Sequence, residues 1–148
     1  MLSDTIATVL NVKGNQVYTI SPEAKALDAV ALMARKRVAA VVVISNGQLA
    51  GIVSAKDFGR RVVLEGQPLE GTTVGDMMSS PVLIVSPTTT VAEAMALMTH
   101  NQIRHLPVME KGELGGIVSM GDLARSVIAE QGFMIDQLQR YVGQGHPV

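Results

Sequence analysis

Short apolar runs alternate with helical patterns along the chain, and the same order occurs twice. Apolar residues at 17–20 and at 82–85 each predict a short strand, and each run is followed by Ser-Pro and a helical pattern. In the second helical segment Val91, Met95 and Met98 share one face. In the first segment the equivalent apolar stripe consists of Leu27, Val30, Ala31 and Ala34.

Each helical segment leads into a predicted hairpin. Residues 41–44 form a β-branched run that is typical of a buried strand, and Asn46-Gly47 is a strong signal for a tight turn. Residues 49–53 then predict the return strand. The second copy repeats this order with residues 106–109, a turn at Lys111-Gly112 and residues 114–118.

The repeat extends well beyond these strands. Residues 21–62 align with residues 86–127 at a constant offset of 65 without a gap. Short helical leads at 6–10 and 74–78 match at an offset of 68, because the first copy has three extra residues around Lys13-Gly14-Asn15. Such a repeat predicts two related units that pack face to face around a ligand cleft. We expect an α/β (α+β) fold of two β-α-β-β-α units in a pseudo-two-fold arrangement. Their boundaries are 5–64 and 74–128, with a linker at 65–73 and a C-terminal helix and tail at 129–148.

Composition excludes several classes of protein. The 148 residues are 47% hydrophobic with a formal net charge of −1, so no basic field favours a nucleic acid. The chain has no cysteine, which excludes disulfides and thiol catalysis and is compatible with a reducing compartment. The N-terminus lacks the pattern of a signal peptide, and the longest apolar run, 38–44, is too short to span a bilayer. We expect a soluble cytoplasmic protein without a membrane partner, whose apolar surplus covers an oligomer interface.

Both copies contain the string Gly-Ile-Val-Ser-x-x-Asp, at residues 51–57 and 116–122. One interpretation is structural, because Ser-x-x-Asp after a strand is a capping box. The other is functional: a glycine lets another group approach the backbone, and a Ser at a helix N-terminus suits a phosphate. The carboxylate three residues later suits the two hydroxyls of a ribose. The two interpretations are compatible, since one Asp can cap a helix and also face a cleft.

The string Arg-His-Leu-Pro-Val at residues 104–108 is a second candidate. It is either a basic helix end followed by a strand entry at proline, or a pair of phosphate contacts from Arg104 and His105. The first copy has Ala39-Ala40 at the same place, so the two halves differ chemically.

Other polar groups carry weaker signals. Lys56, inside the first motif, is a better phosphate candidate than the basic runs 35–37 and 60–61, which we interpret as solvated surface. Tyr18 either packs in the core or lies against a base. The three histidines, His100, His105 and His146, have no metal-ligand spacing with a nearby carboxylate, so we expect no metal site.

The duplicated unit, its Gly-Ile-Val-Ser-x-x-Asp strings and the Arg-His-Leu-Pro-Val segment resemble a tandem pair of cystathionine β-synthase (CBS) domains. The resemblance covers about residues 5–127, and small stand-alone bacterial CBS-domain proteins are especially similar. It implies an adenine-nucleotide ligand, with AMP expected first and ADP, ATP, NAD(H) or S-adenosylmethionine as alternatives. It also implies a flat homodimer of two pairs and no catalytic cofactor.

The same resemblance implies site residues. In the family the Asp holds the ribose, the Ser faces the ribose or phosphate, and apolar strand residues of the partner copy cover the adenine. Lys56 and Pro107 join the predicted nucleotide-binding set. The implied first site is Ser54, Asp57, Leu83, Arg104 and His105. The implied second site is Ser119, Asp122, Tyr18, Ala39 and Ala40. Because the second site lacks these cations, three outcomes stay open there: an adenosine moiety, an empty site, or part of a larger ligand such as NAD(H).

We therefore expect a regulatory module that senses adenine nucleotides and signals to a partner in trans, and not an enzyme. One alternative is an interaction or dimerisation module whose Ser-x-x-Asp strings only cap helices. A nucleotide hydrolase is a further alternative, but no nucleophile–base pair or metal cluster supports it.

Overall fold

A computed structural model describes residues 4–145, including all their side chains except those of residues 133–134 and 141–145. The chain divides into two packing units. The first-repeat unit is Gln16–Ile84, and the second-repeat unit combines Met1–Asn15 with Val85–Val148. Each lead helix therefore packs in the unit of the other repeat.

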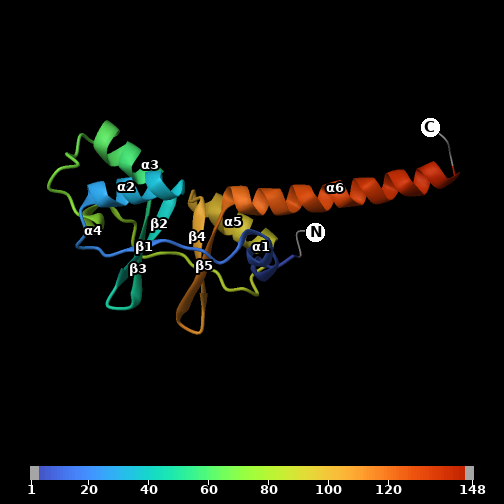
Figure 1. Cartoon of the computed structure of the whole chain (residues 1–148), viewed down its shortest axis with the longest axis horizontal. Helices are drawn as coiled ribbons and strands as arrows, with labels where there is room; N and C mark the ends of the chain where they lie inside the picture. Colours follow the sequence, from blue (N-terminus) through green and yellow to red (C-terminus); the bar gives the residue numbers. More distant parts are fainter. Residues whose placement is uncertain (1–3, 146–148) are drawn as a thin grey trace. The chain divides into compact units, whose positions relative to one another are not determined.

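The first-repeat unit contains a three-stranded sheet in the order β1-β2-β3. β1 pairs in parallel with β2, and β2 pairs antiparallel with β3. The turn residues Asn46 and Gly47 have φ values of 52° and 75°, which confirms the predicted hairpin. The elements, seen in Figure 1, are β1 (Thr19–Ile20), α2 (Ala26–Lys36), β2 (Ala40–Ser45), β3 (Gln48–Ser54), α3 (Ala55–Phe58), the π-helical η1 (Gly59–Leu64) and α4 (Val74–Met77).

The core of this unit lies between α2 and the sheet. Val41 and Val43 of β2 are fully buried in it, as the β-branched run predicts. The predicted apolar stripe of α2 is wrong, because Leu27 is 56% exposed and the buried residues are Ala26, Ala29 and Met33. Apolar side chains occur on adjacent faces of this alanine-rich helix, so periodicity alone does not decide which face is buried.

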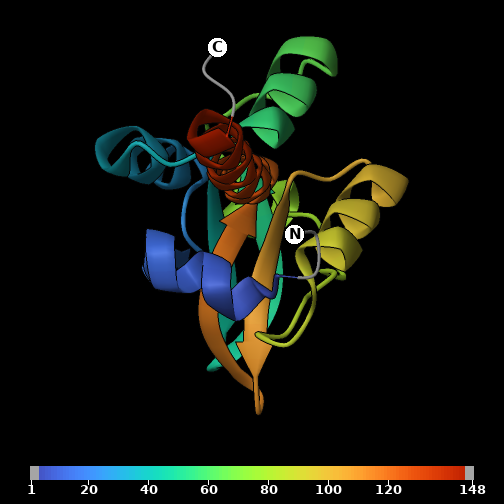
Figure 2. The same cartoon turned by 90° about the vertical axis from the view of Figure 1, so that its right-hand side faces the viewer.

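The second-repeat unit contains an antiparallel hairpin, β4–β5, with its turn at Lys111-Gly112 as predicted. Figure 2 shows α1 lying across this hairpin. The C-terminal helix that the sequence predicts from residue 129 is not separate, since α6 continues without a break from the end of β5 (Figure 1). The elements are α1 (Ile6–Lys13), α5 (Val91–Asn101), β4 (His105–Glu110), β5 (Glu113–Ser119) and α6 (Met120–Gly145).

The strand predicted at 82–85 is wrong. Only Val85 pairs, through an isolated parallel bridge to Val108. In the first repeat the Val42 N–H donates to the Tyr18 carbonyl at 3.0 Å. The residue equivalent to Val42 is Pro107, which has no N–H and therefore cannot continue the ladder.

The start of α5 is fixed by its own side chains. α5 begins at a capping box, in which the Glu93 N–H donates to the Thr90 hydroxyl and the Thr90 N–H donates to the Glu93 carboxylate, both at 3.0 Å.

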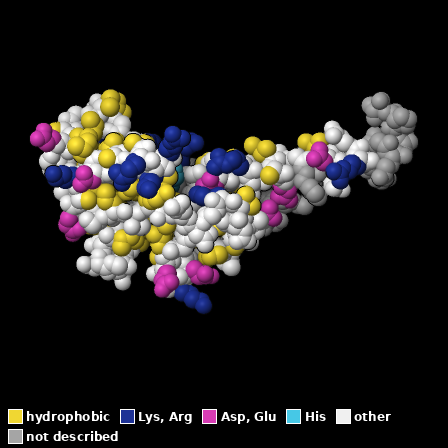
Figure 3. All heavy atoms as spheres, in the orientation of Figure 1, with side chains coloured by type: hydrophobic (Ala, Val, Ile, Leu, Met, Phe, Trp, Pro, Cys, Tyr) yellow, Lys and Arg dark blue, Asp and Glu magenta, His cyan; other side chains and the backbone are white. Residues whose placement is uncertain are grey.

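Beyond Glu130 the described residues of α6 are exposed, and no helix of the described residues is long and apolar enough to cross a membrane. Figure 3 shows apolar side chains along α6, where the exposed ones include Ile128, Ile135 and Leu138.

Candidate functional site

The first Ser-x-x-Asp turn, residues 54–57, joins β3 to α3. The Ser54 N–H donates to the Asp57 Oδ2 at 2.8 Å, and the Asp57 N–H donates to the Ser54 Oγ at 3.4 Å. This reciprocal pair confirms the predicted capping box. Asp57 is only 8% exposed, so the turn holds a carboxylate at the helix start in a largely buried position.

The two oxygens of Asp57 are used unequally. Oδ2 accepts the Ser54 N–H and, at 3.1 Å, the Ser54 hydroxyl. Oδ1 lies 3.5 Å from the guanidinium of Arg60, a long contact whose arginine side chain is 45% exposed. Because a carboxylate oxygen accepts two hydrogen bonds, Oδ1 keeps capacity for a further donor.

The second Ser-x-x-Asp turn, residues 119–122, has the same backbone frame. The Ser119 N–H donates to the Asp122 Oδ2 at 2.8 Å, and the Asp122 N–H donates to the Ser119 Oγ at 3.1 Å. Asp122 is 9% exposed. The repeat therefore builds two similar buried carboxylates at two helix starts.

Asp122 differs from Asp57 in its cations. Lys13 Nζ lies 2.8 Å from Asp122 Oδ2 and also donates to the Ile117 carbonyl at 2.7 Å. The Arg125 guanidinium lies 2.6 Å from Asp122 Oδ1. Burial raises the pKa of Asp122, but the hydrogen bonds from Lys13 and Ser119 outweigh it and lower that pKa below its ordinary value of 3.8.

Sequence reasoning missed these cations. Arg60 and Arg125 both follow the motif Asp by three residues, so the repeat extends to Ser-x-x-Asp-x-x-Arg and gave a usable signal. Lys13 had a weaker signal, since it lies in the three-residue insertion that breaks the offset of 65. Its partner, Asp122, is 109 residues away in the chain.

The motif glycine Gly51 is explained by the chain's own packing. A Cβ at Gly51 would lie 2.6 Å from Met78 Sδ and 2.9 Å from the backbone oxygen of Ser79. Ile52 and Ser79 exchange backbone hydrogen bonds of 3.2 and 2.9 Å at this point. The close approach predicted for the glycine therefore occurs, and the approaching group is the segment after α4.

The residue pair before each hairpin lies beside the Ser-x-x-Asp turn of its own unit. His105 pairs with Ser119 in the β4–β5 ladder, and the Arg104 carbonyl accepts a 2.9 Å hydrogen bond from the first residue of α6. Ala39 and Ala40 hold the corresponding places in the first-repeat unit. The implied grouping of Arg104 and His105 with the turn of the other repeat stays a prediction.

The other predicted residues have mixed surroundings. Tyr18 packs against the first-repeat core, and the Lys36 ammonium lies 5.5 Å from its ring centroid. Pro107 is buried within β4. Leu83 is 41% exposed, and Lys56 is exposed on α3. Their part in nucleotide binding also stays a prediction.

Within residues 4–145 no group of three or more His, Asp or Glu side chains could hold a metal ion. His146 lies outside the described residues.

Comparison with known proteins gives the family. The sequence model of the CBS domain matches residues 11–63 and 74–129. The chain belongs to the CBS-domain family. The predicted resemblance and the mixed helix-and-strand fold with two CBS units are therefore confirmed.

Relatives and solved structures agree with this assignment. The chain is 35% identical to the CBS domain-containing protein CBSX3, mitochondrial, of Arabidopsis thaliana, over 97% of this chain and 74% of that protein. A putative signal-transduction protein with CBS domains from Burkholderia ambifaria MC40-6 is 40% identical with a TM-score of 0.81, over 86% of this chain and 96% of that one. The structure of CBSX2 in complex with AMP is 27% identical with a TM-score of 0.72, over 86% and 98%. CBS domains are generally regulatory modules, and the Burkholderia protein is described as a putative signal-transduction protein.

Proposed function

We propose that this CBS-domain protein is a regulatory module that binds an adenine nucleotide, with AMP as the first candidate, and signals to a partner in trans. The observation that carries the proposal is the pair of largely buried carboxylates, Asp57 and Asp122, each fixed at a helix start by its own Ser-x-x-Asp turn. The complex of the related CBSX2 with AMP supports an adenine nucleotide as the ligand class.

Asp57 is the proposed ribose acceptor of the first repeat. Its Oδ2 is fixed by Ser54, so the side chain is already oriented before a ligand arrives. Its Oδ1 has only the long contact to Arg60 among the described contacts, which leaves room for a ribose hydroxyl. Fixing a binding group in advance lowers the ordering cost of association.

The proposal is tested by calorimetric titration of AMP into the wild-type chain and into Asp57→Ala. A hydrogen bond to a charged group contributes roughly 1.5–3 kcal/mol, so the affinity should fall about 10- to 100-fold. Asp28→Ala is the matched control, because Asp28 also lies in the first turn of a helix but is exposed. The Asp28→Ala variant should bind AMP with the affinity of the wild type. An unchanged Kd for Asp57→Ala removes the ribose assignment.

Arg104 is a proposed phosphate contact, by resemblance to the family. The same titration with Arg104→Ala should weaken AMP much more than adenosine, because only AMP carries a phosphate. Equal losses for both ligands remove Arg104 from that role.

The proposal includes a second copy of the chain as a partner. α6 ends at Gly145, so about 15 of its residues follow Glu130, and the exposed side chains among them include Ile135 and Leu138. An isolated helix of about 15 residues is marginal in water. Light scattering should give twice the chain mass of 15.7 kDa.

One observation favours a second candidate, an interaction module without a ligand. Both Ser-x-x-Asp turns already satisfy their capping hydrogen bonds with the chain's own groups. A thermal-shift panel separates the candidates: a rise in Tm with AMP supports nucleotide binding, and no response to AMP, ATP or NADH supports the interaction module.

A further inference from the structure

A cavity of about 460 Å³ lies in the second-repeat unit, where α1 and α6 meet. This volume falls in the range of small-molecule pockets, roughly 300–1,000 Å³. The Lys13–Asp122–Arg125 ion cluster forms part of its wall. The rest of its lining combines apolar side chains, the hydroxyl groups of Thr8 and Ser126, and two acidic side chains; the apolar residues are Val9, Val12 and Ala129.

The carboxylate in this wall has little capacity left for a ligand. Oδ2 of Asp122 accepts hydrogen bonds from the Ser119 N–H and from Lys13, and Oδ1 accepts a short one from Arg125. A ribose diol needs an acceptor for each of its two hydroxyls. It can therefore bind Asp122 on both oxygens only by displacing Lys13 from Oδ2 and by sharing Oδ1 with Arg125.

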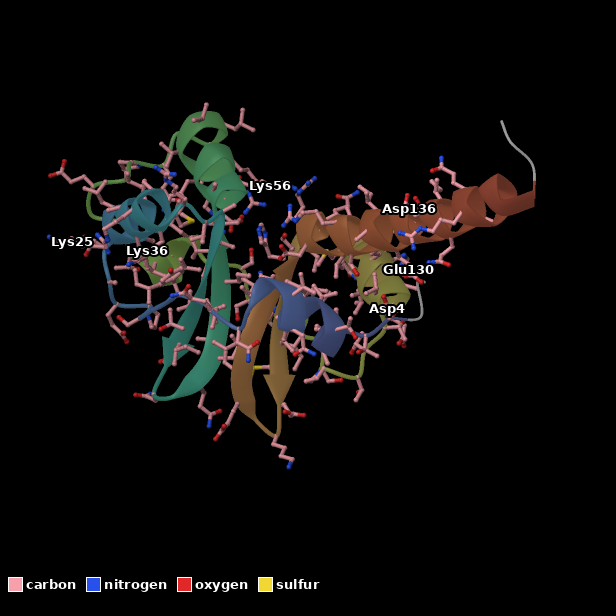
Figure 4. All side chains as sticks on the ribbon, turned by 45° about the vertical axis from the view of Figure 1, so that its right-hand side comes forward. Asp4, Lys25, Lys36, Lys56, Glu130 and Asp136 are labelled. Carbon is pink, nitrogen blue, oxygen red and sulfur yellow. The ribbon has the colours of Figure 1, made fainter. Side chains whose placement is uncertain are left out.

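The acidic groups of the cavity lie at its other end. Asp4 and Glu130 also line it, and Figure 4 shows them close together where the chain enters α1. Asp4 lies just before α1 and Lys13 is its last residue, so the length of this eight-residue helix, roughly 12 Å, separates them. The Lys13 end of the cavity is thus cationic apart from Asp122 itself.

We propose that Lys13 is a specificity-determining residue, which makes the Asp122 site accept phosphorylated nucleosides and reject uncharged ones. The inference rests on the proposed nucleotide-binding function and deepens it. A nucleoside that takes Asp122 leaves the Lys13 ammonium without its anionic partner, and the lysine side chain is only 29% exposed. A phosphate on the ligand replaces the carboxylate as that partner, so the exchange costs far less.

Lys13 also changes the expectation for the second site. Ala39-Ala40 in place of a cationic pair left three outcomes open for it: an adenosine moiety, an empty site, or part of a larger ligand such as NAD(H). The structure places two cations at Asp122 from other segments, Lys13 from the C-terminal end of α1 and Arg125 from the second turn of α6. The Asp122 site thus contains two positively charged side chains, although Ala39 and Ala40 replace the cationic pair.

The test uses full-length chains that carry Asp57→Asn, so that the second-repeat site alone reports. AMP and adenosine are titrated by calorimetry into this background with Lys13 intact, with Lys13→Met and with Lys13→Arg. With Lys13 intact, AMP should bind at least about tenfold more tightly than adenosine, the effect of one charged hydrogen bond. Lys13→Met should reduce this ratio by about tenfold or more, with weaker AMP and stronger adenosine binding, and Lys13→Arg should retain it.

The matched control is Lys25→Met, which removes an exposed lysine at the start of α2 (Figure 4) and should leave the ratio unchanged. If Lys13→Met does not fold, Lys13→Gln carries the same expectation, because it keeps a hydrogen-bond donor and loses the charge. An unchanged ratio, or equal loss for both ligands, overturns the role of Lys13 alone. AMP binding to the wild type but not to Asp57→Asn also overturns it, whereas no AMP binding to the wild type overturns the proposed function itself.

Discussion

Asp57 and Asp122 occupy equivalent places in the two repeats, but their carboxylates meet different cations. Asp57 has an arginine at 3.5 Å, whereas Asp122 has a lysine at 2.8 Å and an arginine at 2.6 Å. The Ser-x-x-Asp-x-x-Arg string is the same in both repeats, so the difference does not arise in the motif. It arises in α1, a helix outside the aligned repeat whose last residue is Lys13. A duplicated motif thus sets the frame of each site, and neighbouring segments set its chemistry.

The motif glycines show a second difference between the repeats. A Cβ at Gly51 would meet a backbone oxygen at 2.9 Å, and a backbone atom cannot move without breaking the Ile52–Ser79 bridge. At Gly116 the nearest atom is the end of the Leu10 side chain, at 3.1 Å. The motif glycine therefore faces a backbone atom in the first repeat and the end of a flexible side chain in the second.

The largest effect that we expect concerns Gly51. Gly51→Ala should lower the free energy of unfolding by about 2–3 kcal/mol, the upper part of the usual range for overpacking, because the new methyl group collides with Met78 and the Ser79 carbonyl. Urea unfolding of the wild type and the variant measures the change.

Gly115→Ala is the matched control. A Cβ at Gly115 would lie 3.6 Å from the Val108 oxygen, an ordinary contact, and the first repeat has Ala50 at this place. Its stability should change by less than about 1 kcal/mol. If Gly51→Ala is as stable as Gly115→Ala, the close approach at Gly51 is not what the motif glycine provides.

A smaller effect should distinguish the two aspartates. At neutral pH Asp122→Asn should lower the free energy of unfolding by about 2 kcal/mol, because Lys13 and Arg125 lose their anionic partner. Asp57→Asn should cost about 1 kcal/mol, since it weakens mainly a helix cap. Equal losses in the free energy of unfolding for the two variants would show that Lys13 and Arg125 do not make Asp122 the more stabilising carboxylate.

The cost of Asp122→Asn should also depend on pH. The pKa of Asp122 is lowered in the folded chain, so its ionised form contributes stability that is present above the unfolded value of 3.8 and is lost as the pH falls through the lower folded value. The difference in the free energy of unfolding between the wild type and Asp122→Asn should therefore be largest near neutral pH and shrink below pH 3.8. Asp76 and Glu93 also have lowered pKa values, through backbone hydrogen bonds from Thr73 and Thr90, but both proteins contain them and their contributions cancel. A difference that stays constant down to about pH 3 would contradict this origin.

Local signals in the sequence predicted much of the fold. Asn46-Gly47 and Lys111-Gly112 adopt the positive φ values that a tight hairpin requires, and the string Thr-x-x-Glu at residues 90–93 forms the capping box of α5. The Ser-x-x-Asp turns also follow from sequence, because their capping hydrogen bonds join residues three apart. Such features depend on a few neighbouring residues and are therefore readable without the structure.

Features that depend on distant residues were missed. The strand at 82–85 reduces to Val85 because of Pro107, which belongs to a neighbouring strand and removes its hydrogen bond. The buried face of α2 depends on what packs against it, so its alanines and not Leu27 face the core. The Lys13–Asp122 pair joins residues at opposite ends of the chain, and no spacing rule connects them.

The central claim is that two similar carboxylates form nucleotide sites with different demands on the ligand. Native mass spectrometry of the wild-type chain with AMP and with adenosine, at equal concentrations, tests it most directly. We expect two AMP molecules per chain but one adenosine, with Asp57→Asn losing the adenosine and keeping one AMP. Equal numbers of AMP and adenosine per chain, or no binding of either, would contradict it.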